Sequence, residues 1–291
     1  MIHASAEAGA KYAKIQALRS NELTFRERFE EGQALADGTT KVNKRPFQAE
    51  QDRLKNLDLN DDDEVWFVEE CKRAGIKSMI TVFTRFSTQR LVVAGFDAVK
   101  VASYDCRSTS LLKEVAESFK TVVVSTGASF DSEILDAAKL FDKNHVSFLH
   151  CVTIYPTPLD QLHMNRMGWL RQFSTKVGFS DHTAPATTNL RASMLAIALD
   201  ADIVERHFTV LEPHETRVGP VSINPIQLRE LCEFAKLSRE SQLERLSADW
   251  PEWKIGLGEQ TRDLSATEQL NSDYYSGRVA ACHKGQLISN Q

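Results

Sequence analysis

The sequence predicts an α/β fold in which strand–helix units repeat around one parallel sheet. From residue 12 onward, short apolar runs of strand length alternate with longer amphipathic segments, which is the pattern of parallel strands joined by helices. Successive runs are mostly separated by roughly 20 to 30 residues, the repeat length of a TIM (β/α)8 barrel. A chain of 291 residues with 42% hydrophobic content is long and apolar enough for one such barrel.

Seven apolar runs are predicted to be strands, at residues 12–18, 78–83, 98–103, 121–127, 146–153, 176–182 and 202–208. The segments between them predict helices, as residues 61–74 illustrate. Four acidic residues occupy the first turn of that segment, where they complement the helix dipole, and Gly75 follows its last turn. We expect Val65, Phe67 and Val68 of this helix to face the sheet.

Seven strands are one fewer than a closed barrel of this type contains. Residues 2–10 (IHASAEAGA) predict the end of a helix that stops at Gly9, so a preceding strand would lie upstream of Met1. We therefore expect a TIM-type barrel that lacks its first strand or has an altered one. Because open strand edges are an aggregation hazard, we expect a second copy of the chain to cover them in a homodimer, with poor solubility as the alternative.

Three further segments complete the predicted organisation. Residues 29–60 are polar and form a long connection, residues 241–275 predict irregular surface structure, and residues 276–291 begin like a short strand before one turn signal. We therefore divide the chain into a barrel domain at 1–275 and a short tail at 276–291.

The composition excludes several classes of partner. A formal net charge of -5 leaves no basic field for nucleic acid or an anionic membrane, so an anionic ligand must be bound by a local cluster. The five cysteines form no C-x-x-C pair, which favours reduced thiols in the cytoplasm. No basic leader or membrane-length apolar run is present in the sequence.

Two lysines interrupt predicted strands that should be almost entirely apolar. Lys14 lies in YAKIQAL and Lys100 in AVKVAS. If Ile15, Val99 and Val101 face the helices, alternation directs both lysines into the barrel mouth. Buried lysines without partners are costly, so two that converge predict a dianion bound between them. The alternative is that each lysine extends outward to solvent from a strand end.

Two histidines follow one another at the carboxyl ends of neighbouring strands. Ser180 and His182 share one face of their strand, and Glu205 and His207 share one face of the next, with Arg206 on the opposite face. Two neutral imidazoles with one or two carboxylates suit a divalent ion such as Mn²⁺, Zn²⁺ or Co²⁺ with open positions. The alternative is that both are core or loop histidines with satisfied hydrogen bonds.

Two other strand ends carry weaker signals. Ser125-Thr126-Gly127 can offer hydroxyl and backbone N–H groups to an anion, although this tripeptide is common at strand ends. Residues 149–158 (LHCVTIYPTP) combine a polar strand end with Tyr155 and two prolines. Cys151 is interpreted as a small packed residue, since no base stands at a fixed spacing from it.

In this order, seven stretches resemble the sialic acid synthase family, which includes N-acetylneuraminate, legionaminic acid and pseudaminic acid synthases and spore-coat polysaccharide proteins. They are AKIQ (13–16), AVKVAS (98–103), VVSTG (123–127), LHCVTIYPTP (149–158), VGFSDHT (177–183), IVERHFT (203–209) and GPVSINPIQL (219–228). Together they span almost the whole chain. The SDHT and ERHFT pair is the specific part.

The resemblance implies a transferase that condenses phosphoenolpyruvate with the aldehyde of an N-acyl mannosamine-like sugar, giving a nonulosonic acid and phosphate. It implies that Mn²⁺, or Mg²⁺ or Co²⁺ in its place, polarises the aldehyde oxygen. Lys14, Lys100, Ser103 and Ser180 match positions that hold phosphoenolpyruvate, whereas Gln16, Asp105 and Tyr155 match positions that line the sugar. We assign catalytic roles to Lys14, Lys100, Asp105 and Glu205, substrate-binding roles to Gln16, Ser103, Ser125, Thr153, Tyr155 and Ser180, and metal-binding roles to His182 and His207.

The chain also departs from the family pattern. Asp105 stands where the family often has Glu, and Val221 follows Pro220 where the family has a sugar-binding aspartate, which Glu212 or Glu215 could replace. The family's first strand, roughly Ala-Glu-Ile-Gly, and the arginine of its C-terminal antifreeze-like domain find no counterpart in this sequence. One alternative is therefore a non-catalytic or truncated homologue that retains the metal and phosphate pockets. Another is a metal aldolase that accepts pyruvate and releases no phosphate.

Overall fold

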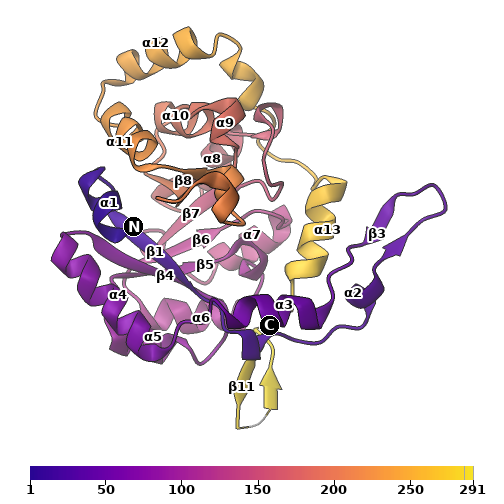
Figure 1. Ribbon diagram of the computed structural model, residues 1–291. Helices are drawn as coiled ribbons and strands as arrows, with labels where there is room; N and C mark the ends of the chain where they lie inside the picture. Colours follow the sequence, from indigo (N-terminus) through magenta and orange to yellow (C-terminus); the bar gives the residue numbers. More distant parts are fainter. Residues whose placement is uncertain (285, 291) are drawn as a thin grey trace.

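The computed structural model describes residues 1–284 and 286–290 and centres on one parallel sheet (Figure 1). Within these residues the sheet has eight strands in the order β1-β4-β5-β6-β7-β8-β9-β10. Their bounds are Tyr12–Ala17 (β1), Lys77–Val82 (β4), Ala98–Val101 (β5), Val122–Ser125 (β6), Val146–Cys151 (β7), Lys176–Asp181 (β8), Ile203–Phe208 (β9) and Ser222–Ile223 (β10). All seven predicted strands are confirmed. The strand β10 was not predicted, because two residues are too few to show a periodic pattern.

Helices cover the outer face of the sheet (Figure 1). They are α1 (Ile2–Glu7), α4 (Asp61–Ala74), α5 (Thr88–Ala94), α6 (Thr109–Ser118), α7 (Asp131–Ala138), α8 (Asn165–Leu170), α9 (Pro185–Thr188), α10 (Arg191–Ala198), α11 (Pro225–Phe234) and α12 (Arg239–Asp249). The predicted helix 61–74 is α4, which ends at Gly75 in a left-handed conformation. Phe67 and Val68 are buried as expected, but Val65 is 40% exposed. For Val65 the prediction was wrong, because the buried stripe of the helix consists of Glu64, Phe67, Val68 and Cys71 and Val65 lies beside it.

The sheet curls like a barrel wall but does not close. In the part of the chain that the structure describes, β1 pairs only with β4, and β10 pairs only with β9. All residues of β9 and most of β1 are partly exposed, whereas β5, β6 and β7 are buried throughout. The expected TIM-type sheet, open where a further strand would fit, is therefore confirmed.

Alternation along the strands separates two apolar clusters. Val99 and Val101 pack with the covering helices in the main core, while Ala98 packs in a small cluster on the other face, with Tyr12 against it. Lys100 and Lys14 each lie two residues beyond a member of that inner group. Both lysines therefore occupy the inner face, one step nearer the carboxyl ends of the strands.

The connection at 29–60 and the last third of the chain contain more regular structure than expected. The former includes α2 (Arg28–Glu31), β2 (Gln33–Ala34), β3 (Thr40–Val42) and α3 (Phe47–Lys55). Residues 241–275 were predicted to be irregular, yet they contain most of α12 and all of α13 (Ala266–Tyr275). Ser265 and Glu268 form a capping box at the start of α13, a sequence signal that the prediction overlooked.

The tail from residue 276 returns along the chain's early segments. Ala280 N donates to Glu22 O, and the hairpin of β11 (Ala281–His283) and β12 (Gln286–Ile288) projects beyond α3 (Figure 1). The division at residue 275 stays a prediction. None of the described helices is both long and apolar enough to span a membrane.

Candidate functional site

Lys14 and Lys100 converge on one carboxylate, Glu205. The Nζ atom of Lys100 lies 2.9 Å from Glu205 Oε2, and that of Lys14 lies 3.4 Å from Oε1. Ser180 Oγ donates to the same carboxylate at 2.7 Å, and Lys14 also donates to Thr81 Oγ1 at 3.2 Å. Five of the strands, β1, β4, β5, β8 and β9, thus contribute one polar side chain each to the inner face. The predicted convergence of the lysines is observed.

Burial and the opposite charges within this group act against each other. Burial would raise the pKa of Glu205, but the ammonium groups of Lys100 and Lys14 outweigh it and hold that pKa below its ordinary value. Burial lowers the pKa of Lys14, and Glu205 opposes that shift. Two cations and one anion leave a net positive charge. An anion that enters beside Glu205 would therefore meet an attractive field.

The rings of His182 and His207 lie side by side, with centroids 5.3 Å apart and planes inclined by 59°. Burial lowers the pKa of both: that of His182 well below its ordinary range and that of His207 to about 4. Both rings are therefore neutral near pH 7 and have lone pairs available. Tyr155 contacts the His182 ring edge-on at 4.5 Å, and Cys151 Sγ lies 3.7 Å from His182 Nδ1.

The two imidazole rings can bind a divalent ion only in a site where most of the ligands do not come from the protein. With a metal–nitrogen bond of about 2.1 Å, two rings on one ion have centroids at most about 6 Å apart, which the observed 5.3 Å satisfies. No group of three or more His, Cys, Asp or Glu suited to a metal ion is found among the described residues, and Glu205 is already held by the lysines. Water or substrate would have to supply the remaining ligands.

Two buried hydroxyls at the strand ends have no hydrogen-bond partner in the described structure: Ser125 Oγ and Thr153 Oγ1. Leaving such groups unpaired is costly, so their positions favour a ligand or bound water. Nearby, Gly127 N donates to Ser103 Oγ at 3.2 Å. A Cβ at Gly127 would lie 2.8 Å from Thr153 Cγ2, so only glycine allows these two strand ends to approach so closely.

Asp105 and Gln16, which were also predicted to belong to the site, have other surroundings than the lysine pair. Asp105 accepts hydrogen bonds from Ser108 Oγ at 2.8 Å and Asn290 Nδ2 at 3.0 Å, and burial raises its pKa. Gln16 is exposed at the end of β1. On the outer face, Arg206 pairs with Asp181 at 2.5 Å, as alternation predicted. The contacts of Asp105 and Gln16 therefore do not join them to the lysine pair.

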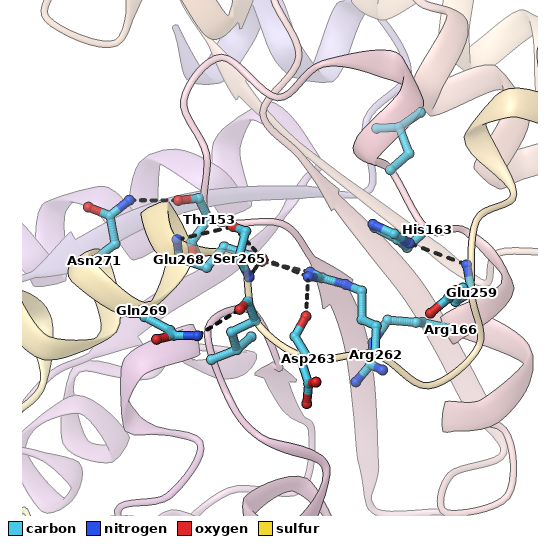
Figure 2. A network of polar contacts seen from close by, with 12 residues as sticks. Thr153, His163, Arg166, Glu259, Arg262, Asp263, Ser265, Glu268, Gln269 and Asn271 are labelled. Carbon is cyan, nitrogen blue, oxygen red and sulfur yellow. Dashed lines mark hydrogen bonds and ion pairs between the residues drawn. The ribbon is translucent and has the colours of Figure 1, made fainter. Parts of the chain in front are cut away.

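Helix α13 holds the loops of the site from outside, a contribution that sequence reasoning missed. Asn271 Nδ2 donates to Thr153 O at 2.7 Å (Figure 2), and Ser272 Oγ donates to Ala128 O at 2.9 Å. The start of the helix is fixed by Arg262, whose two terminal nitrogens each lie 2.6 Å from an oxygen of Glu268. The capping box of α13 was the available signal.

Comparisons with known proteins show which family the chain resembles. The model of the NeuB family matches residues 1–244. Over 306 aligned residues the chain is 26% identical to the N,N'-diacetyllegionaminic acid synthase of Campylobacter jejuni, covering 99% of this chain and 82% of that protein. A 31% identical stretch of 188 residues in an uncharacterised Methanocaldococcus jannaschii protein covers 63% of this chain and 55% of that protein.

A solved structure of a sialic acid synthetase is also similar to this chain. The N-acetylneuraminic acid synthetase of Leptospira borgpetersenii, crystallised with citrate, superposes with a TM-score of 0.67 at 26% identity, covering 94% of this chain and 84% of that one.

Proposed function

The chain belongs to the NeuB family, and on that premise we propose that it condenses phosphoenolpyruvate with the aldehyde of an N-acyl mannosamine-like sugar. A carbon–carbon bond forms between the two substrates, water is consumed, and phosphate leaves. The observation that supports this proposal most directly is the convergence of Lys14 and Lys100 on the inner face beside His182 and His207.

The side chains of the site suit the binding of phosphoenolpyruvate. Lys14 and Lys100 offer ammonium donors to its phosphate and carboxylate. Ser103 and the unpaired hydroxyl of Ser125 lie at the ends of the adjacent strands β5 and β6, and Ser180 lies on β8. Glu205 contacts both ammonium groups and so holds them on the same inner face. Tyr155, Gln16 and Asp105 would line the sugar.

His182 and His207 would hold a divalent cation, Mn²⁺ in the first instance with Mg²⁺ or Co²⁺ as alternatives. When bound, such an ion supplies Lewis-acid polarisation of the aldehyde oxygen. We further propose a homodimer in which a second copy covers the open side of the sheet between β1 and β10. The cytoplasm suits the buried free thiols of Cys71, Cys106 and Cys151.

The proposal is tested by incubating the protein with phosphoenolpyruvate, MnCl₂ and a panel of N-acyl hexosamines, and measuring phosphate and a thiobarbiturate-positive keto acid. We expect both products with at least one sugar, and at least about a hundredfold lower rate in Lys100→Met. Lys176→Met is the matched control, because Lys176 is exposed at the opposite end of its strand. Absence of both products with every sugar would contradict the proposal.

A second candidate is a homologue that binds without turnover, which the open side of the sheet favours. It predicts calorimetric binding of phosphoenolpyruvate that Lys100→Met weakens, with no phosphate released. A metal aldolase would instead consume pyruvate in the same assay.

A further inference from the structure

A second positively charged site lies between α3, α13 and the segment that precedes α2 (Figure 1). It is a hollow open to solvent, and its empty volume of about 270 Å³ includes part of that solvent. Three arginines, Arg26, Arg45 and Arg278, line it together with Glu50 and the aromatic rings of Phe29 and Tyr274. We call it the arginine hollow.

The positive charge of the arginine hollow is not balanced by the carboxylates around it. Arg53 binds Glu50 through two contacts of 2.7 and 2.9 Å, Arg278 also pairs with Glu50, and Arg217 lies 3.6 Å from it. One carboxylate is thus shared by three guanidinium groups. In a chain whose formal net charge is -5, this is a marked local excess of positive charge.

The other two arginines of the hollow have no carboxylate within ion-pair distance among the described residues. Arg26 donates to the carbonyl of Ser276 at 3.1 Å, and its Nε atom is buried without a partner, as is that of Arg278. Glu30, the remaining acidic residue of the lining, already accepts a hydrogen bond from Phe47 N at 2.7 Å.

Aromatic rings hold these guanidinium groups in place without neutralising them. Arg26 lies over Phe29 at 4.3 Å and over Tyr274 at 5.3 Å. Arg45 and Arg278 each lie 5.8 Å from the Tyr274 ring. Stacking of this kind favours a fixed orientation and leaves the N–H donors, which lie in the guanidinium plane, available to an oxyanion.

Size and charge together select the ligand. The free space between its side chains is narrow, so it suits a compact group rather than a whole sugar ring. The excess of several positive charges favours a dianion over a single carboxylate. We propose that the arginine hollow binds a phosphoryl group, carried by a phosphate monoester or present as inorganic phosphate.

Segments that follow strands of the sheet connect the arginine hollow with the end that bears Lys14 and Lys100. Arg217 comes from the segment between β9 and β10, and Tyr275, beside Tyr274, stacks on Tyr104 just after β5, with centroids 4.3 Å apart. A phosphoryl group bound there could belong to an incoming substrate or be the phosphate released. Binding itself does not depend on the proposed condensation.

The test is isothermal titration of inorganic phosphate and of glucose 6-phosphate into the full chain carrying Lys14→Gln, which weakens phosphate binding at the lysine pair. We expect one phosphoryl site whose affinity falls at least about tenfold when Arg26→Gln or Arg45→Gln is added. Arg28→Gln is the matched control, because Arg28 is paired with Asp273 at 2.5 Å and does not line the hollow. It should change the affinity less than about twofold.

Tighter binding of the monoester would assign the hollow to a phosphorylated substrate, and tighter binding of inorganic phosphate would assign it to the released product. Equal affinities in Arg45→Gln and Arg28→Gln, or no binding by folded Lys14→Gln protein, would overturn the proposal. Because Arg45 is exposed, its variant is expected to fold, which circular dichroism verifies. This test measures binding and not turnover, so its failure would leave the proposed condensation unaffected. Likewise, absence of condensation activity would leave the proposed phosphoryl site unaffected.

Discussion

Lys100 Nζ lies 2.9 Å from Glu205 Oε2, and Lys14 meets the other oxygen of the same carboxylate. Glu205→Gln should therefore leave two buried ammonium groups without a counterion and lower the free energy of unfolding by about 2 to 4 kcal/mol. Thermal unfolding of Glu212→Gln, a change at an exposed loop residue, provides the control.

The same variant tests whether a dianion fits the lysine pair. Added phosphoenolpyruvate should raise the melting temperature of Glu205→Gln more than that of the parent, because the ligand supplies the missing negative charge. An equal or smaller shift in the variant would mean that the lysines do not bind the dianion.

Gly127 offers a test of the close approach between strand ends. In Gly127→Ala, the new methyl group would lie 2.8 Å from Thr153 Cγ2 and 3.0 Å from Cys151 O, so we expect a loss of about 1 to 3 kcal/mol in urea unfolding. Gly168→Ala should change stability in the opposite direction by about 0.5 to 1 kcal/mol, because Gly168 is helical with open space around it. Equal effects of both changes would contradict this account.

The strands of the fold could be predicted because each has its own local signal. Buried parallel strands are nearly continuous apolar runs, and alternation within them placed Lys14, Lys100 and Arg206 on their correct faces. The lysines meet Glu205 because of the register between separate strands. This register also places Ser180 opposite Glu205. No local pattern encodes that register, so Glu205 was expected beside the histidines rather than between the lysines.

The contacts of α13 were missed for a related reason. Asn271 and Thr153 are 118 residues apart, and only tertiary packing brings them together. The helix itself had a recognisable start at Ser265, but one proline, two glycines and two tryptophans before it suggested irregular structure. Its relation to the site could not be obtained from any local pattern.

Asn271 is expected to position the Thr153 loop. Asn271→Ala removes the 2.7 Å hydrogen bond to Thr153 O, which should cost about 1 kcal/mol in stability and raise the KM for phosphoenolpyruvate several-fold. Gln269→Ala is the matched control, since Gln269 donates at 2.8 Å to Leu264 O, away from the site loops (Figure 2). It should lower stability similarly and leave KM unchanged. Equal KM values for both variants would indicate a purely structural role.

The burial of His150 predicts that the stability of the protein falls as the pH becomes acidic. Its Nε2 donates to Leu162 O at 2.6 Å, and burial lowers its pKa to about 3, against 6.5 for an ordinary histidine. The folded state disfavours the charged ring, so this residue's contribution is fully present above pH 6.5 and is lost as pH falls toward 3. Between pH 7 and pH 5 the loss should be about 2 kcal/mol.

The check is urea unfolding of the parent and of His150→Gln from pH 7 to pH 5. The variant is less stable at pH 7 because a core side chain is changed, but its stability should decline less steeply as the pH falls. All other titrating groups are common to both proteins and cancel in the comparison. Parallel declines would show that His150 does not titrate on unfolding as proposed.

The last prediction concerns metal binding by His182 and His207. Two neutral rings with centroids 5.3 Å apart can share one ion, and each supplies a single bond, so removal of either leaves one protein ligand. Titration of Mn²⁺ into the metal-free chain should therefore give one site, weakened at least about a hundredfold in His207→Ala. His214→Ala changes an exposed histidine on the loop before β10 and should leave the affinity intact. If Mn²⁺ bound the His207→Ala and His214→Ala proteins equally well, the paired rings would not be the metal site, and the aldehyde would need another electrophile.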